Sequence, residues 1–321
     1  MSNSLDKINI GLNQWMTLII LCFGFLGNFL STFIFIRPVF NHHVCSWYLF
    51  ALSINNSIYS LTVLMYRLLT NGFQIQILSN SLELCKFICY MTTFCTSLSH
   101  YLIVLAAIDR YSASSSNARR RRFNSFETMP RTIVVTIILC ILFSISSPII
   151  SDLNLFDDLG CNIRITTTFN QVYIIIQLIF FAFIAPCLMI LLSILTIRNK
   201  HLAIDQTFAV SKCRHMEAHL SRVVVFIVIT HVIMNLFEWI EYLMLLQPNR
   251  FQSFQFLQTL IRIPIEMSHA MPFIWYLTQS MEFRRELKKT FPCCNCLWKR
   301  AQVNLENEHA HDNHQQQPEV Y

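Results

Sequence analysis

Seven long apolar runs limit this chain to folds that cross a lipid bilayer. Each run has between 19 and 27 residues, and about 20 helical residues are enough to cross a hydrocarbon core about 30 Å thick. Lipid offers no partner to backbone N–H and C=O groups, so each run is expected to be an α-helix. The sequence therefore predicts an all-α membrane protein built as a seven-transmembrane helix bundle. The runs are 14–36, 46–69, 85–111, 132–150, 171–197, 221–246 and 255–279.

Composition supports lipid as the principal solvent of the chain. Hydrophobic residues make up 54% of the sequence and charged residues only 13%, whereas soluble domains are about a quarter charged. Too few ionic groups remain to cover a globule of this size in water, and a composition this apolar also excludes a disordered chain. The first run is longer than the apolar core of a signal peptide, so we expect it to be retained as a span.

The positive charges predict the orientation. Most of the 24 lysine and arginine residues lie in the loops and tail that share one side with the C-terminus, and this pattern places that side in the cytoplasm. We expect a multi-pass plasma-membrane protein whose net charge of +6 suits anionic membrane lipid and requires no nucleic acid. The expected parts are an extracellular N-terminus 1–13, a seven-transmembrane domain 14–279, a membrane-surface amphipathic helix 280–292 and a cytoplasmic tail 293–321.

Three of the twelve cysteines lie at or near the oxidising outer face. Cys85 opens the third run and Cys161 lies in the outer loop 151–170, so a disulfide between them can tie this loop to the top of the helix. Cys89 lies one turn deeper and is the weaker candidate.

A second group of cysteines follows the last run on the cytoplasmic side. Cys293, Cys294 and Cys296 come directly after a short basic stretch with apolar residues at 283, 287 and 291, which is typical of a helix lying along the membrane surface. Juxtamembrane cysteines in such a position are candidates for palmitoylation, with unmodified thiols as the alternative. Their spacing is too tight for a zinc site, so we expect no metal.

The polar residues within the runs carry most of the functional information, because they are costly in lipid. Asp109, Arg110 and Tyr111 close the third run, 24 residues after Cys85. This arrangement resembles the rhodopsin-like (class A) G-protein-coupled receptors, and the resemblance extends from residue 14 to about residue 296. Further matches are Gly27-Asn28, Phe183-Ile184-Ala185-Pro186, Met271-Pro272-Phe273-Ile274-Trp275-Tyr276 and Phe283-Arg284. Within this family, residues 268–274 look similar to invertebrate receptors for FMRFamide- and myosuppressin-type neuropeptides.

The resemblance implies a receptor, not an enzyme, with no catalytic residue and no cofactor, that passes an extracellular signal to a heterotrimeric G protein. It also implies that Glu217 is the acidic partner of Arg110 and that this pair clamps the third and sixth runs together. The alternative is that Glu217 is a solvated charge in the loop.

Several positions depart from the family pattern. The acid of the second span is Asn56 here, so the carboxylate that binds sodium is absent, although Ser99 and Ser268 match other polar positions of that site. The sixth run contains no proline, and Asn235 and Phe237 stand where the family has Trp and Pro. We therefore expect part of the activation relay, which also includes Asn28 and Pro272, to use other side chains.

The outer halves of the runs suggest the class of ligand. Thr92 stands where amine receptors have an acid, and no run has a lysine in its interior for retinal. The charged residues either form internal ion pairs, Glu238–Arg262 or Glu266–Arg67, or line a peptide pocket whose acids receive a cationic end. The candidate pocket residues are Arg67, Thr92, Thr96, Glu238, Glu241, Arg262 and Glu266.

Other classes of function fit the sequence less well. A carrier needs a polar path through the midplane, whereas Asn28, Asn56 and Ser99 are neutral. An enzyme needs a converging catalytic constellation, and the sequence suggests none. An orphan or chemosensory receptor for a small molecule is the alternative to a neuropeptide receptor.

Overall fold

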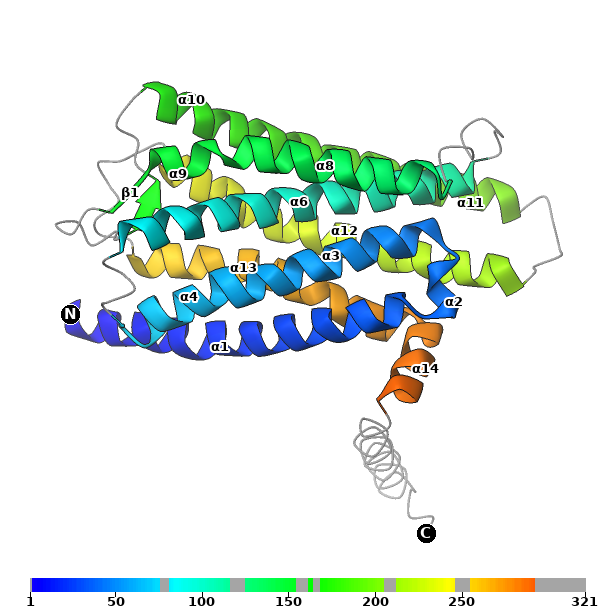
Figure 1. Cartoon of the computed structure of the whole chain (residues 1–321), viewed down its shortest axis with the longest axis horizontal. Helices are drawn as coiled ribbons and strands as arrows, with labels where there is room; N and C mark the ends of the chain where they lie inside the picture. Colours follow the sequence, from blue (N-terminus) through cyan, green and yellow to red (C-terminus); the bar gives the residue numbers. More distant parts are fainter. Residues whose placement is uncertain are drawn as a thin grey trace, which may run out of the picture.

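Long helices that run side by side build most of the described part of the molecule (Figure 1). The computed structural model describes residues 2–75, 81–115, 125–153, 161–163, 168–204, 212–245 and 255–291. The predicted all-helical bundle is confirmed. Its helices are α1 (Ser2–Phe35), α2 (Pro38–Asn41), α3 (Val44–Tyr59), η1 (Ser60–Leu64), α4 (Met65–Arg67), η2 (Leu68–Gly72), α6 (Leu82–Ser114), α8 (Thr128–Ser144), α9 (Ser146–Ile150), α10 (Thr168–Gln177), η3 (Leu178–Ile184), α11 (Ala185–Ile204), α12 (Lys212–Leu245), α13 (Gln255–Gln279) and α14 (Met281–Thr290).

Six helical segments of the described residues are long and apolar enough to cross a membrane. They are Asp6–Phe35, Val44–Gly72, Leu82–Ser114, Thr128–Ile150, Thr168–Asn199 and Glu217–Leu243. The seventh helix of the bundle is α13, which carries Arg262 and Glu266 and contains two prolines. It packs mainly against α1 and α12, so its charged residues face protein neighbours rather than lipid alone.

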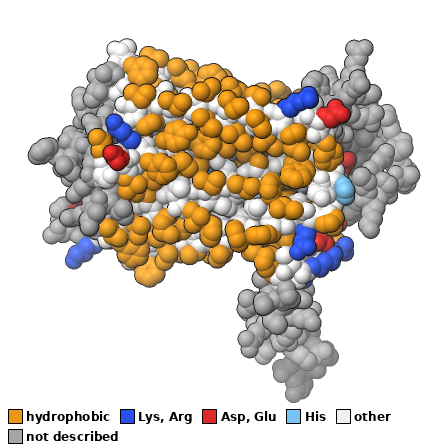
Figure 2. Space-filling model, viewed as in Figure 1, with side chains coloured by type: hydrophobic (Ala, Val, Ile, Leu, Met, Phe, Trp, Pro, Cys, Tyr) orange, Lys and Arg blue, Asp and Glu red, His pale blue; other side chains and the backbone are white. Residues whose placement is uncertain are grey.

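Figure 2 shows a broad band of hydrophobic side chains across the middle of the bundle, with charged side chains gathered at its two ends. Among the large hydrophobic residues, Trp15, Leu139 and Ile149 are more than half exposed. An apolar surface of this extent is stable only against lipid or another apolar partner, and the band therefore marks the part of the bundle that lies in the bilayer.

A small hairpin interrupts the otherwise helical fold at the end of the bundle where the N-terminus lies (Figure 1). This end is called the outer end, and the opposite one the inner end, after the orientation expected from the sequence. Strands β1 (Ser151–Leu153) and β2 (Cys161–Ile163) pair antiparallel, with Leu153 opposite Cys161. Both strands contact α6. The sequence did not indicate these strands, because three-residue strands carry too few side chains for a periodic pattern.

The last helix, α14, turns away from the bundle at its inner end (Figure 1). The Ser280 hydroxyl caps it by accepting a hydrogen bond from the backbone N–H of Phe283 at 3.2 Å. Phe283 is 1% exposed, and its ring packs against those of Phe35 and Tyr276 at centroid distances of 5.8 and 5.4 Å. α14 thus occupies the place expected for an amphipathic helix, with Phe283 on its buried face.

Three stretches of π-helix widen the turns of the second and fifth spans. The stretch η3 lies in the fifth span, and its carbonyls receive hydrogen bonds from α12. Asn235 Nδ2 donates to the carbonyl of Phe181 at 3.4 Å, and Trp239 Nε1 donates to the carbonyl of Ala182. These two hydrogen bonds join α12 to the π-helical segment of the fifth span.

Candidate functional site

Two ion pairs join helices in the outer half of the bundle. Arg67 Nη1 lies 2.5 Å from Glu266 Oε1, with the side chains 17% and 4% exposed. Arg262 Nε lies 2.8 Å from Glu241 Oε1, and these side chains are 24% and 20% exposed. The internal pair that the sequence suggested between Arg67 and Glu266 is therefore present. Arg262 pairs with Glu241 and not with Glu238, which lies against His100 instead.

Glu238 points into the centre of the bundle, where it meets a histidine of α6. Glu238 Oε2 lies 3.4 Å from His100 Nε2, and both side chains are less than a tenth exposed. The same ring nitrogen lies 3.1 Å from Asn235 Oδ1. The other ring nitrogen, Nδ1, lies 2.7 Å from the carbonyl oxygen of Thr96. Both ring nitrogens of His100 thus face oxygen atoms that can accept a hydrogen bond.

A second histidine lies against the first. The His231 ring contacts the His100 ring edge to face at a centroid distance of 4.5 Å. Nε2 of His231 is buried without a hydrogen-bond partner among the described residues. A buried polar atom without a partner is costly in an apolar interior. The His100–Glu238 contact between α6 and α12 therefore lies beside a group whose environment is not fully satisfied.

A third histidine, His269, takes the central position that the sequence assigned to Ser268. Its Nδ1 lies 3.1 Å from Asn56 Oδ1 and 3.4 Å from Ser99 Oγ, while its ring stacks on that of Tyr59 at 3.9 Å. Ser268 instead donates a hydrogen bond to the carbonyl of Ile265 on its own helix. In the described residues, His269 and not Ser268 thus makes the hydrogen bonds to Asn56 and Ser99.

Two asparagines complete the central network. Asn28 Nδ2 donates to the backbone carbonyls of Gly24 at 2.7 Å and His269 at 2.9 Å, which joins α1 to α13. Asn55 Nδ2 donates to Ser99 Oγ at 2.8 Å and joins α3 to α6. Pro272, one turn below His269, is buried. This central network is thus built from side chains of four helices, α1, α3, α6 and α13.

The inner end of α6 carries the charged pair Asp109 and Arg110. Arg110 Nε and Nη2 donate to Asp109 Oδ2 at 2.9 and 2.5 Å, and both side chains are 3% exposed. Arg110 Nη1 and Asp109 Oδ1 are buried without partners among the described residues. No ion pair joins Arg110 to Glu217 in the described part of the chain, so the expected clamp is absent from this conformation. The Arg110 guanidinium pairs instead with the carboxylate of Asp109, the adjacent residue on the same helix.

A histidine just outside the membrane-spanning segments contributes to this inner site. His43 precedes α3, and burial, followed by the charge of Arg110, lowers its pKa. His43 is therefore neutral near pH 7 and adds no second cation beside Arg110. Tyr111, the third residue of the triplet, is half-buried.

The structure describes some of the remaining predicted residues and leaves others outside its described part. Thr92 donates to the carbonyl of Ile88 on its own helix, and Thr96 contributes its carbonyl to His100. Cys85 is fully buried at the start of α6. The side chain of Cys161 and the residues Cys293, Cys294 and Cys296 lie outside the described part of the chain. No group of three or more metal-ligating side chains occurs among the described residues.

Sequence reasoning missed three histidines that the structure brings to the centre. His100, His231 and His269 each lie within an apolar run, and an ionisable residue inside a membrane span is a functional candidate on cost alone. That signal was available in the sequence. The partners of these histidines were not predictable, because they depend on which faces of neighbouring helices meet.

The comparisons with known proteins agree with this geometry. Residues 27–275 match the family model described as 7 transmembrane receptor (rhodopsin family). No individual curated protein gave a significant match to the sequence.

The buried ion pair of Arg67 and Glu266 yields a stability prediction. Arg67→Gln and Glu266→Gln are each expected to destabilise the protein by about 3–5 kcal/mol, because either change leaves an uncompensated buried charge. The double variant is expected to lose much less than the sum. Thermal unfolding of the purified full chain in detergent compares the stability of the native protein, the two single variants and the double variant.

The more exposed pair provides the matched control. Arg262→Gln and Glu241→Gln are expected to cost less, since solvent can reach both groups. Additive losses at Arg67 and Glu266 would show that the two side chains do not act as a pair.

Proposed function

Because the chain belongs to the rhodopsin family of seven-transmembrane receptors, we propose that it passes the signal of an extracellular ligand to a heterotrimeric G protein. Members of this family are membrane receptors and not enzymes. Within the proposal, the protein lies in the plasma membrane with its N-terminus outside, as the distribution of lysine and arginine indicates.

The observation that best supports coupling is the state of Arg110 at the inner end of α6. Its Nη1 group is buried and has no partner among the described residues, although an arginine donor in an apolar site normally has one. In our proposal, movement of α12 away from α6 exposes Arg110, and the G protein offers a carbonyl or carboxylate acceptor to it. Asp109 then becomes the residue that holds Arg110 in the absence of the partner, and Tyr111 borders the docking surface.

In this proposal Glu217 does not hold Arg110 permanently. It lies at the inner end of α12 and is half-buried. It acts on Arg110 through a longer-range attraction and forms a direct pair only in conformations in which Arg110 leaves Asp109.

The outer ion pairs support a peptide with a cationic end as the ligand. Glu241 and Arg262 are both partly exposed, so an arginine of a peptide can replace Arg262 on the Glu241 carboxylate. Glu238 and Glu266 are deeper and already hold His100 and Arg67. The resemblance of residues 268–274 to receptors for FMRFamide- and myosuppressin-type neuropeptides favours the same class of ligand. A small-molecule ligand is the alternative.

Two covalent features belong to the proposal. The first is a disulfide between Cys85 and Cys161. It is supported by the burial of Cys85 at the start of α6 and by β2, which begins at Cys161 and contacts α6. The second is palmitoylation of Cys293, Cys294 or Cys296, which would anchor the chain beyond α14 to the inner leaflet.

Nucleotide exchange tests the coupling. Membranes that contain the full chain, mixed with purified heterotrimers of each G-protein class, are expected to take up labelled GTP analogue faster when an active amidated peptide is added. Arg110→Ala is expected to remove most of this stimulation, because it deletes the donor that the G protein engages. Arg131→Ala, an exposed arginine at the inner end of α8, is the matched control and should retain the response. Stimulation that survives in Arg110→Ala would refute the assigned role.

The charge of the ligand is tested at Glu241. Glu241→Gln is expected to weaken a cationic peptide by about 1.5–3 kcal/mol, the scale of a charge-assisted hydrogen bond. An analogue with citrulline in place of arginine should lose little further affinity on the variant. Glu83→Gln, at an exposed acid of α6, is the control, and surface expression is measured beside binding. Equal losses for both peptides would show that Glu241 only holds Arg262.

A further inference from the structure

A cavity on the lipid-facing side of the bundle lies apart from the polar interior. It has a volume of about 340 Å³ and lies between α6, α8 and the π-helix η3. Its mouth opens toward the bilayer, since Leu139 and Phe180 on its rim are 60% and 45% exposed. The side chains that line it are Tyr101, Thr136, Leu139, Cys140, Phe143, Phe180 and Phe181.

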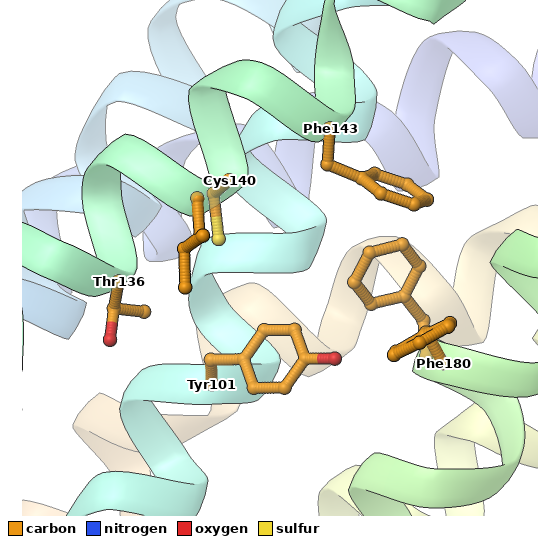
Figure 3. A pocket seen from close by; sticks show the side chains of 7 residues that line it. Tyr101, Thr136, Cys140, Phe143 and Phe180 are labelled. Atoms are coloured by element: carbon orange, nitrogen blue, oxygen red, sulfur yellow. The ribbon is translucent and has the colours of Figure 1, made fainter.

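One polar group in this apolar cavity is unused. Figure 3 shows the hydroxyl of Tyr101 pointing across the cavity toward Phe180. No hydrogen bond to this hydroxyl is formed by any described residue, whereas the hydroxyl of Thr136 donates to the carbonyl of Thr132 at 2.8 Å. A tyrosine hydroxyl in an apolar environment usually finds a partner. Beside the weak donor of the free Cys140 thiol, the cavity therefore offers one strong donor, the Tyr101 hydroxyl.

The size of the cavity limits what it can hold. An apolar cavity of about 150 Å³ lined by aliphatic and aromatic side chains binds benzene. A cavity of about 340 Å³ therefore accommodates roughly two aromatic rings by the same measure. We propose that this cavity binds a lipophilic molecule of about two rings with a single hydrogen-bond acceptor, which enters from the bilayer and accepts a hydrogen bond from Tyr101.

The cavity is connected to the centre of the bundle through Phe181. The Phe181 ring contacts the ring of Phe143 at 4.9 Å and that of Tyr101 at 5.8 Å. Its backbone carbonyl accepts the hydrogen bond from Asn235 of α12, and Asn235 Oδ1 in turn faces His100. An occupant of the cavity thus packs against the segment that is bonded to α12. The proposed binding to the cavity does not depend on the proposed function. An effect of the occupant on signalling rests on that function.

Benzophenone is a suitable probe, because it has two rings and one carbonyl. Under near-ultraviolet light its carbonyl takes a hydrogen atom from a nearby C–H bond, and the two carbon radicals combine, so the adduct has the summed mass. The full chain in phosphatidylcholine nanodiscs is irradiated at rising benzophenone concentrations, and the adducts are located by peptide mass spectrometry. The expected result is saturable labelling at the cavity-lining segments of α8 and η3.

Three variants test the geometry of the site. Tyr101→Phe keeps the ring and is expected to raise the half-saturating concentration about three- to tenfold, as loss of one hydrogen bond does. Thr136→Phe fills the cavity and should abolish saturable labelling. Val135→Phe adds the same bulk on an exposed position of the same helix and should leave labelling unchanged. Diphenylmethane, which lacks the carbonyl, should compete more weakly than benzophenone does on the native protein and equally well on Tyr101→Phe.

Other outcomes would overturn the proposal. Labelling that does not saturate, or that is equal in Thr136→Phe and Val135→Phe, would mean ordinary lipid contact and no site. If Thr136→Phe does not fold, the isosteric variant Tyr101→Phe still tests the site. Benzophenone and diphenylmethane should compete equally well on this variant and unequally on the native protein. In exchange assays with an active peptide as positive control, benzophenone should change the basal rate of the native receptor and not that of Thr136→Phe. Saturable labelling without this change would refute the link through Phe181.

Discussion

The hydrocarbon core of a bilayer offers no hydrogen-bond partner, so a polar side chain inside this bundle depends on partners within the protein. This constraint explains the arrangement of contacts at three depths. Arg67 and Glu266 join the second and seventh spans near the outer end, and His269 joins Asn56 and Ser99 at the centre. At the inner end, Asp109 and Arg110 satisfy each other only in part. The contacts between helices set their relative register, and the incomplete inner pair is where a partner can act.

The contact between α6 and α12 has consequences beyond its own residues. His100 lies against Glu238 and Asn235, and Asn235 and Trp239 donate hydrogen bonds to two carbonyls of η3. A displacement of α12 must therefore break several contacts together, because one helix supplies all of them. Such linked contacts favour two distinct arrangements over a continuous range. The third, fifth and sixth spans thus form one mechanical unit in this account.

The sequence predicted the helices well and their partners poorly, for a physical reason. Apolar runs of sufficient length require helices in lipid, so the seven segments followed from composition and length. Partner choice depends on the rotation of each helix, and neighbouring residues differ by about 100° around the axis. This is why His269 and not Ser268 reaches the centre, and why Glu241 and not Glu238 reaches Arg262. The π-helical turns add a further rotation that no pattern of apolar residues indicated.

The most direct test of this account measures the distance between the inner ends of α8 and α12 by double electron–electron resonance. Spin labels are attached at Arg131 and Arg222, which are exposed at these ends. If the contact of His100 with Glu238 holds α12 against α6, then His100→Gln and Glu238→Gln should each add a population at longer distance, and Glu83→Gln should not. An unchanged single distance in both central variants would contradict the account.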